Sequence, residues 1–197
     1  MKKLALLLGA LILAGTFMTA CSGDGHKNGG DGVYTDVSEY TEGVTSAEGY
    51  ESAWSGIKFT ASDSITMADD EELAEIAALE DGAIYEMMAT DNTNYDTVLV
   101  RTLSAGEGVT FEDYLTAQLD SIKSQYEANG LNVEYSELDN ATFGGRSYRG
   151  ALYTVSMNGT AIYQCVYRAM LGDRISEVYF TYSDEAAFNA LMDCFAE

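Results

Sequence analysis

The sequence predicts an α+β fold, in which helices flank an antiparallel β-sheet. Three features support this prediction: runs of alternating polar and apolar residues, tight turns between those runs, and helices that each carry one apolar stripe. The chain has 197 residues, of which 47% are hydrophobic. About 150 residues remain after an N-terminal apolar stretch and a Gly-rich segment, which suffices for one domain with its own core.

The domain is expected to begin near Tyr50. Residues 50–59 alternate polar and apolar side chains over much of their length, as a first strand would, and residues 65–67 suit a short second strand. Acidic residues 69–72 then open a helix whose apolar positions Leu73, Ile76 and Leu79 follow helical spacing, and Gly82 ends it. Acidic side chains in a first turn favour the helix dipole, so this cluster needs no metal.

The middle of the chain predicts a hairpin and then a long helix. Residues 83–89 and 97–103 form strands joined by an Asn- and Asp-containing loop. Thr110 caps the helix with Asp113 three residues later, and Asn129-Gly130 ends it. One core-packing stripe runs along this helix and comprises Phe111, Tyr114, Leu115, Leu119, Ile122 and Tyr126.

The C-terminal part predicts a strand at residues 133–138, a bend at residues 143–145, and three antiparallel strands. Asn158-Gly159 is a strong hairpin signal that sets Met157 opposite Thr160. The remaining pairs of this register are Val155 with Ile162, Leu152 with Cys165 and Arg149 with Arg168. A turn at Gly172-Asp173 adds the pairs Arg168 with Glu177 and Cys165 with Phe180. Ser183 is expected to cap a final helix with Phe188, Leu191, Met192 and Phe195 facing inward.

This register gives the sheet two different faces. The first is apolar and should be covered by helices; it carries Tyr148, Leu152, Tyr163, Cys165, Tyr167, Val178, Phe180 and Tyr182. The second carries Arg149, Arg168 and Glu177 beside Tyr153, Val155, Ile162 and Tyr179.

Arg149, Arg168 and Glu177 are the candidate site residues. Two arginines opposed across strands repel each other unless a carboxylate intervenes, and Glu177 is placed to do so. Structural ion pairing is the favoured interpretation, and a small anion site or a contact with a partner is the alternative.

Cys165 and Cys194 are the cysteines of the predicted domain. An exported pair invites a disulfide. A helix on a sheet usually keeps backbones farther apart than the ~7 Å that a disulfide allows, which favours two buried free thiols.

The N-terminus has the features of a secretory signal peptide. Lys2-Lys3 precedes an apolar stretch at residues 4–20, and the sequence Met18-Thr19-Ala20-Cys21 resembles the lipobox of bacterial lipoproteins. The resemblance implies that Cys21 carries a diacylglycerol thioether with a palmitate-type acyl chain. The alternative is an uncleaved signal anchor. We therefore expect a lipoprotein signal peptide at 1–20, a flexible acidic Gly-rich tether at 21–49, a domain at 50–197, and a location on the extracytoplasmic face of the cell membrane.

Charge narrows the choice of partners. The chain has 10 basic and 32 acidic residues, a net charge of −22. Nucleic acid and anionic lipid headgroups are repelled by such a field, so both are rejected as partners. The acidity serves solubility, or else it attracts cations or a basic envelope protein.

The arrangement of the long helix at residues 110–129, the Phe143-Gly144-Gly145 bend, and the three-strand meander with its terminal helix resembles PsbP-like domains. The opening with Trp54 and Gly56 is similar as well. This resemblance spans residues 50–197. It implies an antiparallel sheet sandwiched between helices and a non-enzymatic binding or assembly module without shared catalytic residues or a cofactor.

A membrane-tethered binding or accessory module is therefore the first hypothesis, and an extracytoplasmic hydrolase is the second. Residues 145–150 are one residue too long for the G-x-S-x-G elbow, and the single histidine, His26, lies in the linker. Carboxylate-only glycosidase chemistry stays open, as does cation binding by the acidic surface. No catalytic or metal-binding residue and no cofactor is assigned.

Overall fold

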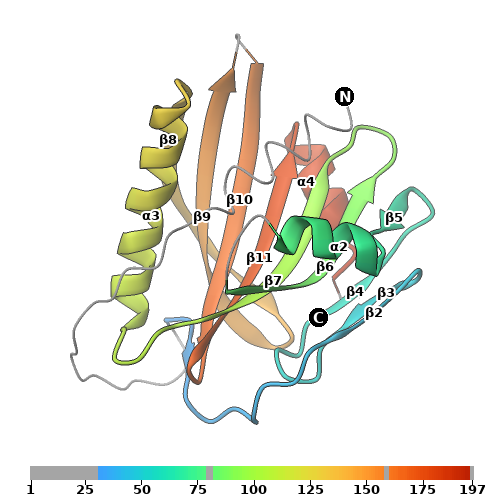
Figure 1. The fold of residues 1–197 in the computed structure, drawn as a ribbon. Helices are drawn as coiled ribbons and strands as arrows, with labels where there is room; N and C mark the ends of the chain where they lie inside the picture. The colour runs from blue at the N-terminus through green and yellow to red at the C-terminus, as the bar shows by residue number, and fades with distance from the viewer. Residues whose placement is uncertain (1–30, 79–81, 158–159, 196–197) are drawn as a thin grey trace.

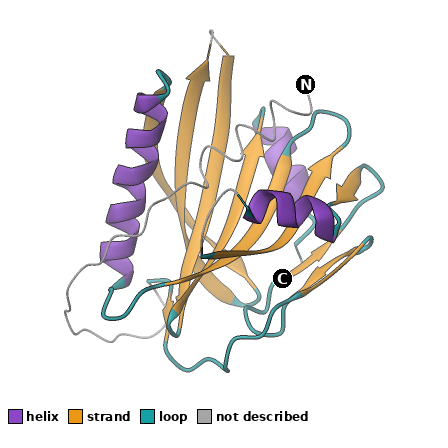
Figure 2. Ribbon diagram, viewed as in Figure 1, coloured by secondary structure: helices purple, strands orange, loops and turns teal. Residues whose placement is uncertain are grey.

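The computed structural model describes residues 31–78, 82–157 and 160–195. The predicted signal peptide and Cys21 lie outside the described residues. Figure 1 shows a large twisted sheet in the centre with helices on both sides. The strands form the middle layer, as their colour in Figure 2 makes plain.

The large sheet is antiparallel except at one short strand. Its order is β5-β6-β7-β11-β10-β9-β8. The bounds are β5 (Ile65–Met67), β6 (Ala83–Asp91), β7 (Thr97–Ser104), β8 (Asn132–Phe143), β9 (Arg146–Met157), β10 (Thr160–Leu171) and β11 (Arg174–Tyr182). A second, three-stranded sheet consists of β2 (Val44–Ser46), β3 (Gly49–Glu51) and β4 (Lys58–Thr60). The predicted fold class, an antiparallel sheet flanked by helices, is confirmed.

The predicted registers of the last three strands are correct. Val155 lies opposite Ile162, Leu152 opposite Cys165 and Arg149 opposite Arg168. Across the following turn, Arg168 lies opposite Glu177. Tight two-residue turns fix a register locally, so this part of the sheet could be predicted from its turn sequences. Asn158 and Gly159 themselves lie outside the described residues.

Three helices are described: α2 (Asp70–Ala77), α3 (Phe111–Ala128) and α4 (Glu185–Met192). Asp69 caps α2, and Thr110 caps α3 by accepting a hydrogen bond from the Asp113 amide. Ser183 was expected to cap the last helix, but Asp184 does so. The Ser183 hydroxyl instead forms a hydrogen bond with Asp96, because the turn places it beside the β6–β7 loop.

Each face of the large sheet is covered in a different way. Helices α2 and α3 cover the face that holds Tyr153, Val155 and Tyr179. The apolar face was expected to lie under helices. It is covered by α4 and, in addition, by the three-stranded sheet and the turn between β3 and β4. Phe59 of β4 and the turn residues Trp54 and Ile57 belong to the same core as Phe180. Figure 1 shows α4 behind the large sheet and α2 and α3 in front of it.

Residues 50–59 were expected to form one strand, but they form a hairpin. The backbone turns at Ser52, whose N–H donates to the Ile57 carbonyl at 2.9 Å. Gly56 adopts a left-handed conformation with φ of 78°. The turn residues between 52 and 56 have no alternating pattern to hold them extended, and the glycine permits the reversal.

The tether was expected to reach residue 49, but the folded part begins earlier. Strand β1 (Val33–Tyr34) pairs in parallel with β10, opposite Met170 and Leu171. The Met170 N–H donates to the Gly32 carbonyl at 2.7 Å. The pairing of β9 with β10 ends at Arg149 and Arg168. Strand β1 therefore occupies the place beside β10 that β9 has left.

Candidate functional site

The candidate site is a row of polar side chains that crosses the helix-covered middle of the large sheet. Strand pairing sets Arg101 opposite Glu177 and Glu177 opposite Arg168. Tyr85 and Arg149 continue the row on the two outer sides. Five neighbouring strands, β6, β7, β11, β10 and β9, thus contribute one residue each.

Glu177 is held by both arginines on its flanks. Nε of Arg101 donates to Oε2 of Glu177 at 2.6 Å, and Nε of Arg168 donates to Oε1 at 2.6 Å. The three side chains are buried, with 1%, 2% and 0% of Arg101, Arg168 and Glu177 exposed. We call this group the Arg–Glu–Arg network. Charge-assisted bonds of this kind are strong because the interior screens them little.

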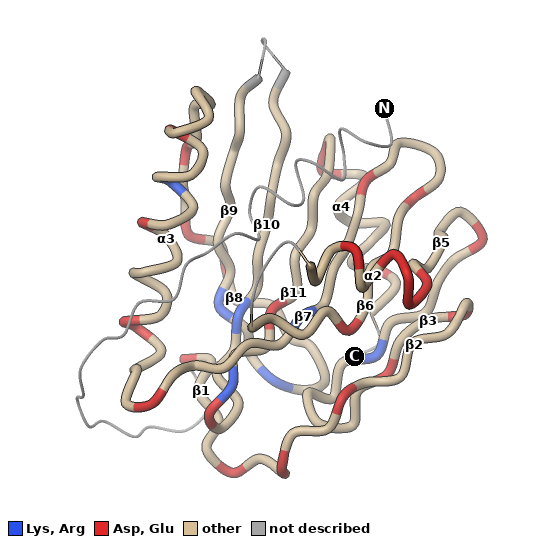
Figure 3. The backbone as a smooth tube through the Cα atoms, viewed as in Figure 1, with Lys and Arg blue, Asp and Glu red and all other residues tan. Residues whose placement is uncertain are grey.

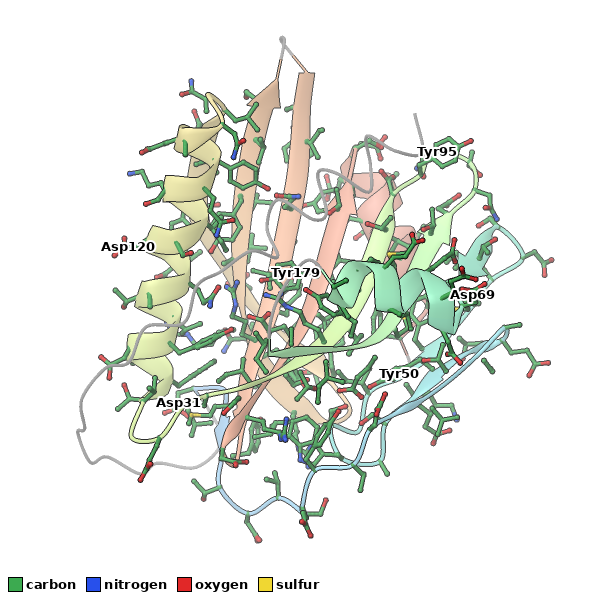
Figure 4. All side chains as sticks on the ribbon, in the orientation of Figure 1. Asp31, Tyr50, Asp69, Tyr95, Asp120 and Tyr179 are labelled. Carbon is green, nitrogen blue, oxygen red and sulfur yellow. The ribbon has the colours of Figure 1, made fainter. Side chains whose placement is uncertain are left out.

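Tyrosines complete the network. The Tyr179 hydroxyl accepts hydrogen bonds from Arg101 at 2.9 Å and from Arg168 at 3.1 Å. Arg101 also donates to the Tyr85 hydroxyl at 3.3 Å, and its guanidinium lies 4.8 Å from the centre of the Tyr179 ring. Figure 4 labels Tyr179 near the middle of the sheet. The aromatic faces thus stabilise the buried cations as well.

The long helix takes part through Tyr114. Its hydroxyl donates to Oε1 of Glu177 at 2.8 Å and connects α3 to β11. The apolar stripe of α3 was expected to serve core packing alone. Phe111, Ile122 and Tyr126 do pack in the core, but Tyr114 contributes a polar contact as well.

The electrostatics keep Glu177 ionised. Burial by itself would raise the pKa of Glu177, but Arg101 and Arg168 outweigh it and lower the pKa from 4.5 to about 2. Burial raises the pKa of Tyr179 to about 12 and that of Tyr114 well above 10. Because its pKa is about 2, Glu177 cannot act as a proton donor near neutral pH. The network is therefore suited to holding the strands and α3 together.

The sequence led us to expect that Arg149 and Arg168 share the Glu177 carboxylate, but Arg149 does not. It forms an ion pair with Glu112 on α3 instead. The side chain of Arg149 is 30% exposed and that of Glu112 is 70% exposed. The Glu177 carboxylate instead contacts Arg101 as well as Arg168. Sequence reasoning missed Arg101 because no local turn joins β7 and β11.

A second buried carboxylate, Glu86, was also missed. Oε2 of Glu86 accepts hydrogen bonds from the Tyr50 hydroxyl at 2.7 Å and from the Gly43 amide at 2.9 Å. Its Oε1 accepts from Thr102. Glu86 lies where the β6–β7 register shifts, between Tyr85 and Met87. Such a bulge redirects a side chain, here towards the three-stranded sheet.

Both cysteines of the domain are free thiols in the structure. Cys165 and Cys194 belong to the apolar core on the α4 side of the sheet. Burial raises the pKa of Cys165 to about 12 and also raises that of Cys194. The favoured interpretation of two buried free thiols is confirmed.

Among the described residues, no group of three or more His, Cys, Asp or Glu side chains is arranged to hold a metal ion. None of the described helices combines the length and apolarity that crossing a membrane requires.

The sheet order, the flanking helices and the terminal helix define a PsbP-like fold. A similar solved structure is the solution structure of cyanobacterial PsbP (CyanoP) from Synechocystis sp. PCC 6803, with a TM-score of 0.51 and 11% sequence identity. The match covers 80% of this chain and 97% of that chain. At this identity the likeness shows the fold alone. Comparison with known protein families finds no match, and comparison with curated protein sequences finds none either.

Proposed function

We propose that the protein is a membrane-tethered, non-enzymatic accessory module that binds a partner on the extracytoplasmic face of the cell membrane. In this proposal a lipid on Cys21 holds the chain to the membrane, and residues 22–30 connect it to the domain. The PsbP-like fold and the lipobox-like sequence at residues 18–21 both support it.

The observation that carries the proposal is the burial of the Arg–Glu–Arg network. Its guanidiniums and its carboxylate bond to one another and to tyrosines across β7, β10, β11 and α3. These are the most chemically distinctive side chains of the domain, and they stabilise the scaffold from within. A rigid scaffold can support a binding surface, and an acidic exterior attracts cationic partners.

The attachment of the N-terminal segment supports the tethering part of the proposal. The Gly32 carbonyl accepts a hydrogen bond from Met170 of β10, and the Tyr34 carbonyl accepts one from Gly172 just after β10. The Tyr34 hydroxyl accepts a bond from the Ser147 amide at 2.6 Å. A pull on residues 1–30 would therefore act on the central sheet through β1. Figure 4 labels Asp31, the first described residue, near the beginning of α3.

The test compares the wild-type chain with Cys21→Ala in bacterial cells. We expect the wild-type protein to incorporate radiolabelled palmitate, to sediment with membranes and to be crosslinked to a reproducible set of envelope proteins. Cys21→Ala should lose all three, while the control Cys194→Ala keeps them. If Cys21→Ala stays equally membrane-bound, the lipid anchor is wrong. If neither form captures a reproducible partner, the accessory role is wrong.

A further inference from the structure

The sheet ends on one side in a long strand whose outer edge pairs with none of the other described strands. Strand β8 has 12 residues and is the last strand of the large sheet. Among the described strands it pairs only with β9. The strand at the opposite end, β5, has only 3 residues. Every second residue of such an edge directs its N–H and C=O groups away from the sheet, where they can pair with another chain.

The side chains on β8 are mostly exposed and strongly acidic. Glu134, Glu137 and Asp139 are all exposed, and the strand contains no Lys or Arg. Tyr135 is 42% exposed, which makes it one of the few large apolar side chains on the described surface. Its ring rests on the ring of Tyr153, with 5.5 Å between their centres. The edge thus combines backbone pairing groups, negative charge and a supported aromatic ring.

The neighbouring helix adds charge of the same sign. Helix α3 lies next to β8, and Figure 3 shows acidic residues spread along it. Asp120 and Glu127 are exposed, and Lys123 is the one basic residue within the helix. A cationic segment that approaches β8 therefore meets an attractive field from both elements.

We propose that the edge of β8 binds an extended, basic segment of a partner protein by strand addition. The segment's backbone extends the sheet beyond β8. Its Lys or Arg side chains meet Glu134 on one face of the sheet and Glu137 on the other, with Asp139 further along the strand, and its apolar side chains contact Tyr135. Backbone bonds supply affinity in this mode, and the side chains select the partner. The inference names the binding surface of the accessory module proposed above, but it does not depend on lipid attachment.

A second copy of this chain fits the edge poorly. If two β8 strands paired about a two-fold axis at Glu137, Glu137 of each copy would lie directly opposite Glu137 of the other. Like charges directly opposite one another are destabilising. The acidic edge thus disfavours pairing with itself and favours a cationic partner.

The experiment uses the full chain in a non-ionic detergent and a synthetic peptide as long as β8 that repeats two lysines and two threonines, which places lysines on both of its faces. Two derivatives carry N-methyl groups, one on alternate residues and one on every residue. The first keeps one edge with free N–H groups that can face β8, and the second keeps none. We expect the first derivative to bind within about twofold of the parent and the second to bind at least tenfold more weakly. Amide hydrogen exchange should show new protection within residues 132–143.

Charge variants test the chemistry of the partner. Neutralising the edge with Glu134→Gln, Glu137→Gln and Asp139→Asn should weaken binding about tenfold. The matched control is the triple variant Asp63→Asn, Glu71→Gln and Glu75→Gln, which removes three exposed carboxylates elsewhere and should change binding less than about twofold. A glutamate–threonine peptide should not bind.

Three outcomes would overturn the inference. Equal binding of both N-methylated peptides would show a contact by charge alone. If the edge variant and the control variant lose equal affinity for the peptide, the attraction comes from the charge of the whole protein and not from β8. If the chain forms dimers and the edge variant forms them more readily than the wild type, the occupant of β8 is a second copy of this chain. The proposed function is tested separately, because loss of Cys21-dependent membrane attachment leaves the peptide result unchanged.

Discussion

Tyr114 and Glu177 are 63 positions apart in the sequence, and the hydroxyl of Tyr114 donates a 2.8 Å hydrogen bond to Oε1 of Glu177. This bond joins the long helix to the centre of the sheet. The same oxygen accepts a hydrogen bond from Arg168. Glu177, on β11, thus connects β7, β10 and α3. Its removal should therefore destabilise the whole domain.

Removal of the Glu177 charge should be strongly destabilising. Glu177→Gln leaves two buried guanidiniums without their carboxylate, and the free energy of unfolding should fall by about 3–5 kcal/mol. Urea denaturation measures this change. The control Glu112→Gln breaks the exposed ion pair with Arg149 and should cost less than about 1 kcal/mol. Equal costs for the two variants would contradict a structural role of the network.

Acid should weaken the network in a defined window. Because the pKa of Glu177 is lowered from 4.5 to about 2, its contribution to stability is complete above pH 4.5 and disappears as the pH falls towards 2. The stability difference between wild type and Glu177→Gln should therefore shrink from neutral pH to about pH 3. Chemical denaturation of both proteins at several pH values measures it. A difference that grows in acid would contradict the lowered pKa.

Two adjacent glycines should respond very differently to alanine. A Cβ at Gly144 would lie 2.3 Å from the backbone carbon of Gly56, whereas a Cβ at Gly145 meets nothing within 4 Å. Both residues have positive φ, so each substitution also adds backbone strain of about 1 kcal/mol. We expect Gly144→Ala to lower the melting temperature far more than Gly145→Ala. Similar shifts would mean that the hairpin of β3 and β4 moves aside readily.

Glu86 should hold the N-terminal segment of the domain in place. Glu86→Ala removes the acceptor of the Gly43 amide and of the Tyr50 hydroxyl. Cleavage by a glutamate-specific protease after Glu39 and Glu42 should become several-fold faster, because local opening becomes easier. Mass spectrometry of the early fragments measures the rates. The exposed control Glu48→Gln should leave cleavage at those two sites unchanged.

The two core thiols should be unreactive in the folded protein. Cys165 and Cys194 are buried, and burial raises the pKa of both, so little thiolate forms. In a Cys21→Ser variant, a thiol reagent at pH 8 should label neither residue before unfolding and both after it. Rapid labelling of the native protein would contradict their burial.

The sequence by itself determined the elements whose signals are local. The turn at Gly172-Asp173 sets Arg168 opposite Glu177, and Thr110 begins α3 where its capping pattern predicts. A tight turn leaves few choices of register, and a helix cap acts within a few residues. For this reason the Arg168–Glu177 pair, one of the two ion pairs of the Arg–Glu–Arg network, could be predicted from the sequence.

Only the tertiary structure decided the rest. Arg101 meets Glu177 because β7 pairs with β11 across 76 positions of sequence, and no turn signals that pairing. The segment before Tyr50 has few aliphatic residues, so its sequence resembles a tether. It folds because β10 offers backbone partners to β1 and Glu86 offers a buried acceptor to Gly43. Contacts of this kind depend on which surfaces the finished fold brings together, and local patterns do not encode them.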